Sequence, residues 1–433
     1  MNSPLSGGDI FGGAFAGGAQ RIDVKKIVAQ SAVETHFQPL VSIKSQAIVG
    51  LEALARGIHD FDGRLILPST LFRLATAEAA TAELDALCRH RALENFADLR
   101  RQYPDLLLFL NFYTPAFGAP PFGGERIVAQ LPEDLAKHNL PSGSVALEID
   151  ETKFESAAAL QELANAAKES GFLLAMIGLG AAQSNLERVS LCQPDLLKID
   201  QSLVAGLEEQ EHRQETFRAL VQLARRNGAL AVAQGIESQE QAIVALELGA
   251  DLLQGFYFAR PQNLSALDFD AMSERIQIVA DRYKAHMLAK INARKGRHRS
   301  YNVILNSILA ELSRVQVEKF DACLSELIAL YPSIECAYVL DEAGRQVSET
   351  ICNRQYHRPL SKSSIFHPPP RGADHSLQEY FYLLLDVELN KFTTQPYVSL
   401  STGNLCSTIS TLFRDAHNNR MFVLCIDVTA KAN

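Results

Sequence analysis

The stretch Ala47–Arg56, AIVGLEALAR, is the most informative part of the sequence. Ile48 and Val49 are β-branched and apolar, which is typical of a strand. Glu52 follows where this apolar strand becomes accessible, and Arg56 lies four residues further along. A carboxylate and a guanidinium at that place indicate a metal or phosphate site rather than core.

Eight apolar runs between residues 35 and 260 predict strands, and amphipathic helices such as Glu215–Asn227 separate most of them. Alternating strands and helices imply a mainly parallel sheet, so the pattern predicts an α/β fold, a TIM-like (β/α)8 barrel. An open doubly wound sheet is the alternative, although no glycine-rich phosphate turn follows the first strand. The expected strands are Phe37–Ile43, Ile48–Leu54, Leu106–Phe112, Val145–Ile149, Phe172–Leu179, Leu196–Ile199, Leu230–Ile236 and Leu252–Phe258.

Polar residues recur where these strands end, which is where (β/α)8 barrels carry their active sites. Each residue alone also has a structural interpretation: Asp200 as a helix N-cap, Asn111 as a turn residue, Glu151 as a surface charge. Their recurrence at successive strand ends favours a functional site. The polar positions are Glu52, Asn111, Glu148 with Glu151, Lys198 with Asp200, Gln234 with Glu237, and Gln254.

In order and spacing these motifs resemble the EAL-domain family, the cyclic di-GMP phosphodiesterases. The resemblance covers about residues 30 to 262 and implies an EAL barrel over 30–263. The matching segments are FQP at Phe37–Pro39, EALAR at Glu52–Arg56, LFLNF with Asn111, LEIDE with Glu148 and Glu151, LLKID with Lys198 and Asp200, QGIE at Gln234–Glu237, and QGFYFARP at Gln254–Pro261.

The resemblance implies two-metal hydrolysis of one phosphodiester bond, in which Mg²⁺ or Mn²⁺ polarises the phosphate and activates a water. The metal ligands among the matching residues are Glu52, Asn111 and Glu148. Lys198 corresponds to the family lysine beside the attacking water or phosphate, and Gln254 supports that network. Hard divalent cations require such oxygen ligands.

The sequence departs from the family pattern at three positions. Ile177 and Gly178 replace the two aspartates that follow the fifth strand in active members, and Gln234 replaces a glutamate. Two neighbouring divalent ions need carboxylates to coexist, so we expect no two-metal centre. We therefore expect no cofactor, with Mg²⁺ or Mn²⁺ only if residual activity exists. One weakly held ion on the remaining ligands is the alternative.

Ligand binding needs fewer groups than hydrolysis, and the resemblance implies a nucleotide groove. Arg56 is expected to bind a phosphate bidentately; a salt bridge to Glu52 or a nearby carboxylate is the alternative. Glu237 is expected to accept hydrogen bonds from a guanine edge. The implied ligand-binding residues are Gln38, Leu54, Arg56, Asp85, Asp200, Glu237, Gln254 and Pro261.

Three functions follow from these observations. The first is a degenerate, catalytically inactive cyclic di-GMP receptor or regulator that passes ligand occupancy to the rest of the chain. The second is a nucleotide-independent scaffold for protein partners. The third is a weak metal-dependent phosphodiesterase that produces linear pGpG. Family resemblance also implies a homodimer.

Outside the barrel, residues 1–29 are glycine-rich at their start and predict a disordered tail. Residues 264–300 predict a helical linker, which ends in a basic cluster interpreted as a solvated face. Residues 301–433 predict a small α+β domain that resembles PAS-like or Cache-like sensor domains, chiefly over PYVSLSTGNLCSTISTLFRDAHNNRMFVLCIDV.

Composition limits the remaining functions. The net charge of −9 gives no reason to expect DNA binding. No apolar run approaches the length that spans a bilayer, and no signal peptide is evident, so we expect a cytoplasmic protein. The seven cysteines form no CxxC pair and predict reduced core thiols. A redox or metal-sensing role for the five after residue 320 is the alternative.

Overall fold

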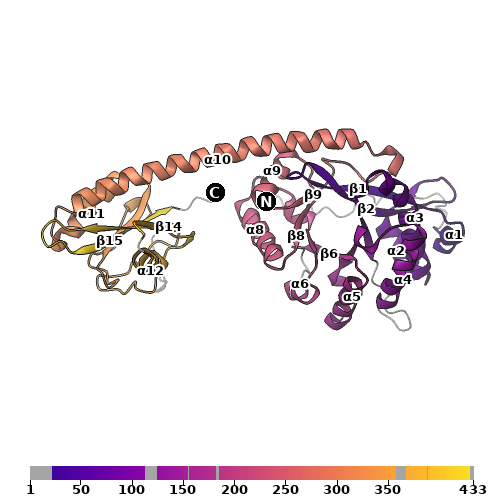
Figure 1. The fold of residues 1–433 in the computed structure, drawn as a ribbon, viewed down its shortest axis with the longest axis horizontal. Coiled ribbons are helices and arrows are strands. Elements are labelled where there is room, and N and C mark those ends of the chain that lie inside the picture. Colours follow the sequence, from indigo (N-terminus) through magenta and orange to yellow (C-terminus); the bar gives the residue numbers. More distant parts are fainter. Residues whose placement is uncertain are drawn as a thin grey trace, which may run out of the picture. The chain divides into compact units, whose positions relative to one another are not determined.

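The computed structural model describes residues 22–112, 124–154, 156–181, 185–356, 367–387 and 389–429. Their contacts divide the chain into two units, Met1–Leu288 and Ala289–Asn433. The first unit contains a closed barrel, and the second contains a smaller sheet (Figure 1).

The barrel confirms the predicted TIM-like fold. The strands β2 and β4 to β9 pair in parallel, whereas β1 pairs antiparallel with both β2 and β9 and so closes the barrel. The short β3 extends β2 as an antiparallel edge. The strands are β1 (Val33–Ser42), β2 (Ala47–Ile58), β3 (Leu65–Ile66), β4 (Leu107–Phe112), β5 (Val145–Asp150), β6 (Leu173–Leu179), β7 (Leu196–Ile199), β8 (Leu230–Gln234) and β9 (Leu252–Gln254).

Helices lie outside the strands (Figure 1). In α8 the residues Phe217, Leu220, Val221 and Ala224 are buried, which confirms the apolar stripe read from the sequence. The helices of the first unit are α1 (Val24–Ala29), α2 (Pro68–Ala77), α3 (Thr81–Gln102), α4 (Gly124–Lys137), α5 (Ala157–Glu169), α6 (Leu186–Cys192), α7 (Gln201–Val204), α8 (Glu211–Arg226) and α9 (Gln239–Glu247), with 3₁₀ turns η2 (Ser142–Ser144), η3 (Glu151–Lys153) and η4 (Leu264–Ala266).

The barrel interior begins with an apolar layer to which seven strands each contribute one buried residue. Gly50 of β2 faces the Phe109 ring, and a Cβ at Gly50 would lie 2.6 Å from that ring. The glycine of GLEALAR therefore makes room for the largest side chain of the layer. The contributing residues are Leu40, Phe109, Ala146, Ala175, Leu196, Val232 and Leu252.

The N-terminal part of the barrel unit differs from the prediction. Residues 1–21 lie outside the described residues, but 24–29 form α1, so the disordered tail predicted over 1–29 is wrong there. Asp23 caps this helix by accepting a hydrogen bond from the Lys26 N–H. Val24 and Ile27 are buried, and their burial holds this short, marginal helix in place.

The helix α10 (Phe269–Leu312) continues beyond the linker predicted over 264–300. Its start packs on the barrel core through Met272, Ile276 and Val279. Its end contributes Leu305, Ile308 and Leu312 to the core of the second unit. Residues 291–300 between these two contacts are exposed. The domain boundaries that the sequence suggests stay predictions.

The second unit is an antiparallel sheet with helices. One face of the sheet packs on α10 and α11, and the other carries a smaller cluster that includes Tyr338, Tyr380 and Phe381. The elements are η5 (Val317–Lys319), α11 (Phe320–Leu330), β10 (Ile334–Leu340), β11 (Ile351–Cys352), η6 (Arg354–Tyr356), α12 (Glu379–Asp386), β12 (Lys391–Thr393), β13 (Tyr397–Val398), β14 (Leu405–Arg414) and β15 (Met421–Thr429).

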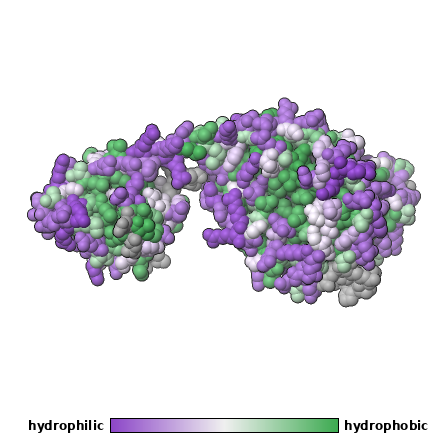
Figure 2. Space-filling model, viewed as in Figure 1, coloured by the Kyte–Doolittle hydropathy of each residue, from purple (hydrophilic) through white to green (hydrophobic). Residues whose placement is uncertain are grey.

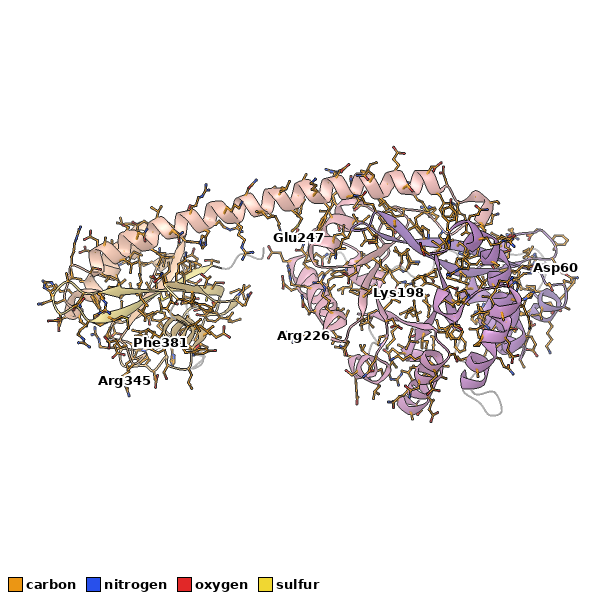
Figure 3. The ribbon with its side chains drawn as sticks, viewed as in Figure 1. Asp60, Lys198, Arg226, Glu247, Arg345 and Phe381 are labelled. Atoms are coloured by element: carbon orange, nitrogen blue, oxygen red, sulfur yellow. A yellow bond between two sulfur atoms is a disulfide. The ribbon has the colours of Figure 1, made fainter. Side chains whose placement is uncertain are left out.

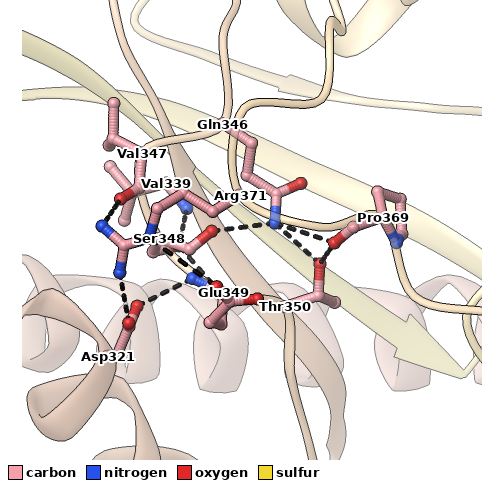
Figure 4. Close-up of polar contacts among 9 residues, drawn as sticks. All are labelled: Asp321, Val339, Gln346, Val347, Ser348, Glu349, Thr350, Pro369 and Arg371. Atoms are coloured by element: carbon pink, nitrogen blue, oxygen red, sulfur yellow. Dashed lines mark hydrogen bonds and ion pairs between the residues drawn. The ribbon is translucent and has the colours of Figure 1, made fainter.

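Polar contacts anchor the segment between β10 and β11 (Figure 4). Asp321 of α11 accepts hydrogen bonds from the Glu349 N–H and from Arg371. The Gln346 amide donates to the Pro369 carbonyl at 3.2 Å. These contacts join residues that lie up to 50 positions apart in the sequence. They hold the segment between β10 and β11 in place, although it forms no strand.

Two cysteines differ from the predicted reduced state. Cys336 and Cys352 face each other on β10 and β11 and form a disulfide. Their separation of 16 residues matches no motif, so the sequence carried no signal for this pair. Cys88, Cys192, Cys323, Cys406 and Cys425 are free thiols, as predicted.

Among the described residues, no helix is long and apolar enough to cross a membrane. Figure 2 shows hydrophilic side chains over much of both units on the face in view, with hydrophobic ones scattered among them. Scattered apolar side chains of this kind are normal on protein surfaces.

Candidate functional site

A polar layer lies directly above the apolar layer of the barrel. Residues two positions beyond Phe109, Ala146 and Leu196 on their strands are Asn111, Glu148 and Lys198. Because alternate residues of a strand face the same side, this spacing turns them into the barrel. Glu52, Gln38, Gln234 and Gln254 join the layer, and Figure 3 shows Lys198 among the barrel strands. The structure thus brings together the strand ends that the sequence singled out.

Lys198 is the centre of this layer. Its ammonium group donates to Glu52 Oε2 at 2.6 Å and to Glu148 Oε1 at 2.5 Å. Lys198 is fully buried, and both carboxylates are almost fully buried. The lysine therefore joins the carboxyl groups of β2 and β5, whose negative charges would repel each other strongly in a medium of low dielectric constant if both were ionised.

The three charges shift one another's pKa values. Burial opposes ionisation of Glu52, but Lys198 together with the hydrogen bonds from Gln254 and Asn111 outweighs burial and lowers the pKa of Glu52 to about 2. Burial and the negative charge of Glu52 raise the pKa of Glu148 to about 8. Burial opposes the charge of Lys198, yet the two carboxylates raise its pKa above the ordinary value. At neutral pH the favoured state is one carboxylate, one ammonium and one protonated carboxyl.

Three glutamine side chains extend the network from Glu52. Gln254 Nε2 donates to Glu52 Oε2 at 2.7 Å and to Gln38 Oε1 at 3.3 Å. Gln234 Nε2 donates to Gln254 Oε1 at 3.4 Å. Asn111 Nδ2 donates to the other oxygen of Glu52 at 3.1 Å. Gln234 therefore acts as a hydrogen-bond donor, a role that an ionised glutamate cannot fill.

The backbone is irregular near the end of β6. Gly178 adopts φ +81°, a left-handed conformation that favours glycine, and the β6–β7 register shifts between Met176 and Leu179. Glu151 is buried and accepts from the Asn185 N–H at 2.7 Å, so its predicted alternative role as a surface charge is wrong. Arg188 also contacts Glu151 and fixes the beginning of α6.

These residues do not fit the pair of divalent cations that the resemblance implies. Ile177 and Gly178 offer no side-chain oxygen, and Gln234 offers no charge. An ammonium already contacts both remaining carboxylates. Within the described ranges, no group of three or more His, Cys, Asp or Glu side chains is arranged to hold a metal ion.

Two cavities open beside this network, and Leu54, Asp150 and Ile177 line both. The smaller has a volume of about 420 Å³, and cationic Arg73, Arg89 and Lys153 are among its lining residues. The larger has a volume of about 620 Å³. Its polar lining comprises Gln38, Glu52, Asp150, Thr152, Asp200, Gln201, Gln234, Glu237 and Gln254.

Most of the predicted ligand-binding residues face these cavities. Gln38, Asp200, Glu237 and Gln254 line the larger, Asp85 lines the smaller, and Leu54 lines both. Asp200 also caps α7, so its alternative structural role is real. Their assignment to a ligand stays a prediction.

Two predicted ligand-binding residues line neither cavity: Arg56 and Pro261. Arg56 is almost fully buried opposite Glu34 of β1, and burial lowers the pKa of its guanidinium. Its Nη1 donates to the Ala55 carbonyl at 2.9 Å. Both interpretations of Arg56, as a phosphate ligand and as a partner of a nearby carboxylate, stay predictions.

Sequence reasoning missed two features of the site. Asp85 forms a buried ion pair with Arg89, one turn later on α3, and this i,i+4 spacing was a usable signal. Phe256 lines the larger cavity with part of its ring exposed, which a sequence pattern cannot show.

A family model, the EAL domain, matches residues 22–261. The chain belongs to the EAL-domain family. The cyclic di-GMP phosphodiesterase RocR of Pseudomonas aeruginosa is 31% identical over 243 residues, which are 55% of this chain and 60% of RocR. The uncharacterized EAL-domain protein YkuI of Bacillus subtilis is 24% identical over 382 residues, 87% of this chain and 90% of YkuI. This EAL protein thus spans less than two thirds of RocR.

Solved EAL structures show the same fold. YkuI in complex with its substrate cyclic di-GMP and calcium has a TM-score of 0.76 at 23% identity and covers 95% of this chain and 100% of that one. The FimX EAL domain from Pseudomonas aeruginosa, bound to cyclic di-GMP, has a TM-score of 0.51 at 20% identity and covers 57% of this chain and 99% of that one. At these identities the likeness establishes the fold alone.

Proposed function

We propose that this EAL protein is a cyclic di-GMP receptor that binds the dinucleotide without a metal pair and does not hydrolyse it. One observation carries the proposal: the fully buried Lys198 ammonium bridges Glu52 and Glu148. Hydrolysis by the mechanism of this family would require these two carboxylates as metal ligands.

The energetics of this arrangement oppose metal entry. A divalent ion on Glu148 must first displace a proton, because the pKa of that carboxyl is raised to about 8. It must then lie beside the Lys198 ammonium, whose positive charge repels it at close range. Active two-metal sites instead supply extra carboxylates that lower the repulsion between the ions. Ile177, Gly178 and Gln234 supply none.

The shape of the site supports a two-part ligand. The cavities of about 420 and 620 Å³ share the wall formed by Leu54, Asp150 and Ile177, and each lies in the size range of small-molecule sites. A cyclic dinucleotide has two nucleosides whose riboses are joined by two phosphates, so one base in each cavity places the phosphates near the shared wall. Glu237 and Asp200 offer acceptors to guanine N–H donors. Arg73 and Lys153 offer positive charge to a phosphate.

A second candidate is the nucleotide-independent scaffold, and one observation favours it. The larger cavity is lined by Glu52, Asp150, Asp200 and Glu237 but by no described Lys or Arg. Four carboxylates repel the phosphates of a dinucleotide unless the guanine donors offset that repulsion. A barrel that binds only protein partners has no such conflict.

Titration calorimetry with the full chain and cyclic di-GMP in EDTA separates these functions. The receptor predicts saturable binding, which Ile177→Phe weakens at least tenfold, about 1.4 kcal/mol, because the ring fills the junction of the cavities. Leu186→Phe, on the exposed surface of α6, is the matched control and should bind as wild type. No binding to the wild-type chain favours the scaffold. Formation of pGpG with Mg²⁺ or Mn²⁺ identifies the weak phosphodiesterase.

The proposal extends to the rest of the chain. We propose that the second unit, with its antiparallel sheet, is a PAS-like or Cache-like sensor and that α10 connects it to the barrel. Assembly as a homodimer and a cytoplasmic location belong to the same proposal. Size-exclusion chromatography with light scattering tests the dimer.

A further inference from the structure

The disulfide between Cys336 and Cys352 joins two strands of very different length in the second unit. β10 has seven residues and pairs with β15 along most of its length, whereas β11 has two residues and lies at the edge of the sheet. The two cysteines stand directly opposite each other, and Ala337 with Ile351 forms the other residue pair between these strands. The disulfide therefore makes up much of the link between β11 and β10.

The two sulfur atoms differ in their access to solvent. Cys336 is fully buried, whereas Cys352 on the edge strand is partly exposed. A thiolate attacks the sulfur that it can reach, so Cys352 is the point of attack and Cys336 is the leaving group. Asp427 of β15 stands directly opposite Cys336, and burial raises the pKa of its carboxyl to about 7. A proton donor thus lies beside the sulfur that leaves as a thiolate.

The main core of the second unit does not depend on β11. Its cluster joins α10, α11, β10, β14 and β15 through buried side chains such as Phe320 and Phe422, and no residue of β11 is among the buried members. Ile351 of β11 packs against this cluster but is only partly buried. The same cluster contains Leu305 at the end of α10. Loss of the disulfide should therefore loosen β11 beside the residues that hold this helix, without unfolding the unit.

We propose that Cys336 and Cys352 form a reversible switch that releases β11 when the pair is reduced by a dithiol. The proposal goes beyond cyclic di-GMP binding, because it gives the second unit a signal of its own, the thiol–disulfide balance around it. One thiolate of the dithiol attacks the Cys352 sulfur and displaces Cys336, which takes a proton. The second thiol then displaces Cys352 and closes a disulfide within the reductant. The cysteine pair gains two electrons and two protons, and the dithiol loses them.

The test is hydrogen exchange of the full chain, read by mass spectrometry with and without dithiothreitol, while a portion of each sample is alkylated to count free thiols. The Asn353 N–H donates to the Glu335 carbonyl at 2.8 Å beside the disulfide and reports on β11. A disulfide that closes a loop of about 15 residues is worth about 100-fold in an unfolding equilibrium, so exchange in residues 351–353 should quicken roughly 10- to 100-fold on reduction. Exchange in β14 and β15 should not change, and oxidised dithiothreitol should restore the slow rate.

Serine variants separate the switch from other effects of the reductant. Cys336→Ser combined with Cys352→Ser should show the fast exchange with or without dithiothreitol. Cys323→Ser is the matched control, because it removes a partly buried free thiol of α11, and it should respond as wild type. The switch is refuted if the folded chain keeps its disulfide in dithiothreitol, or if exchange in 351–353 is unchanged after reduction. Loss of protection throughout the sheet would also refute it, because the disulfide would then be needed for the fold.

Discussion

Replacing Lys198 by methionine should destabilise the barrel far more than the loss of an ordinary lysine. The substitution keeps an apolar stem of similar length but leaves Glu52 and Glu148 facing each other, both buried and without their common cation. Breaking a buried ion pair on one side typically costs about 3–5 kcal/mol. For a barrel of this size, each kcal/mol lowers Tm by about 2–4 °C, so the expected loss is about 6–20 °C.

The assay is urea and thermal unfolding followed by circular dichroism at pH 7. Lys44→Met is the matched control, because Lys44 forms a half-exposed surface pair with Asp251 at 3.2 Å. Its loss should cost less than about 1 kcal/mol. Adding Glu52→Gln and Glu148→Gln to Lys198→Met should restore most of the stability, because no uncompensated charge then remains. A loss below 1 kcal/mol for Lys198→Met, or no recovery in the triple variant, would refute the bridging role.

Three further outcomes follow from the same site. The pKa of Glu148 in the native state, about 8, exceeds its ordinary value of 4.5. The stability that its proton confers is therefore fully present below about pH 4.5 and should be lost as pH rises to about 8. In urea unfolding at a series of pH values, the free energy of unfolding of Glu148→Gln should depend less on pH than that of wild type. Gly178→Ala should cost about 1–2 kcal/mol despite open space, because φ is +81° there, whereas Gly143→Ala should be neutral or slightly stabilising; equal unfolding midpoints would contradict this. Millimolar Mg²⁺ or Mn²⁺ should leave the Tm of the barrel unchanged from EDTA, and a rise that Glu52→Ala abolishes would show a bound ion.

Much of the barrel was predictable because its strands are short apolar runs with clear boundaries. The antiparallel pairing of β1 with β2 and β9 was not, because an apolar run carries no direction relative to its neighbours. The continuous α10 was not predicted either, since the expected linker ended at residue 300, after the basic cluster that contains Gly296. One glycine costs a long helix only about 1 kcal/mol, and packing at both ends exceeds that cost.

The site, like the fold, was predictable from the sequence only in part. The order of motifs predicted that Glu52, Asn111, Glu148 and Lys198 meet, and they do. Lys198 bridges both carboxyl groups because its long side chain extends from β7 to residues on β2 and β5. The spacing of residues along the chain does not show such a contact. The position of Arg56 beside Glu34 depends on strand pairing in the same way.

The central claim is that this EAL protein binds cyclic di-GMP without metal. Its most direct test is a comparison of the dissociation constant measured in EDTA with that measured in Mn²⁺, with the nucleotide recovered and analysed for pGpG afterwards. We expect constants that agree within about twofold, since RT ln 2 is below half a kcal/mol, and intact cyclic di-GMP in both samples. Binding that requires Mn²⁺, or pGpG whose formation Glu52→Ala abolishes, would contradict it.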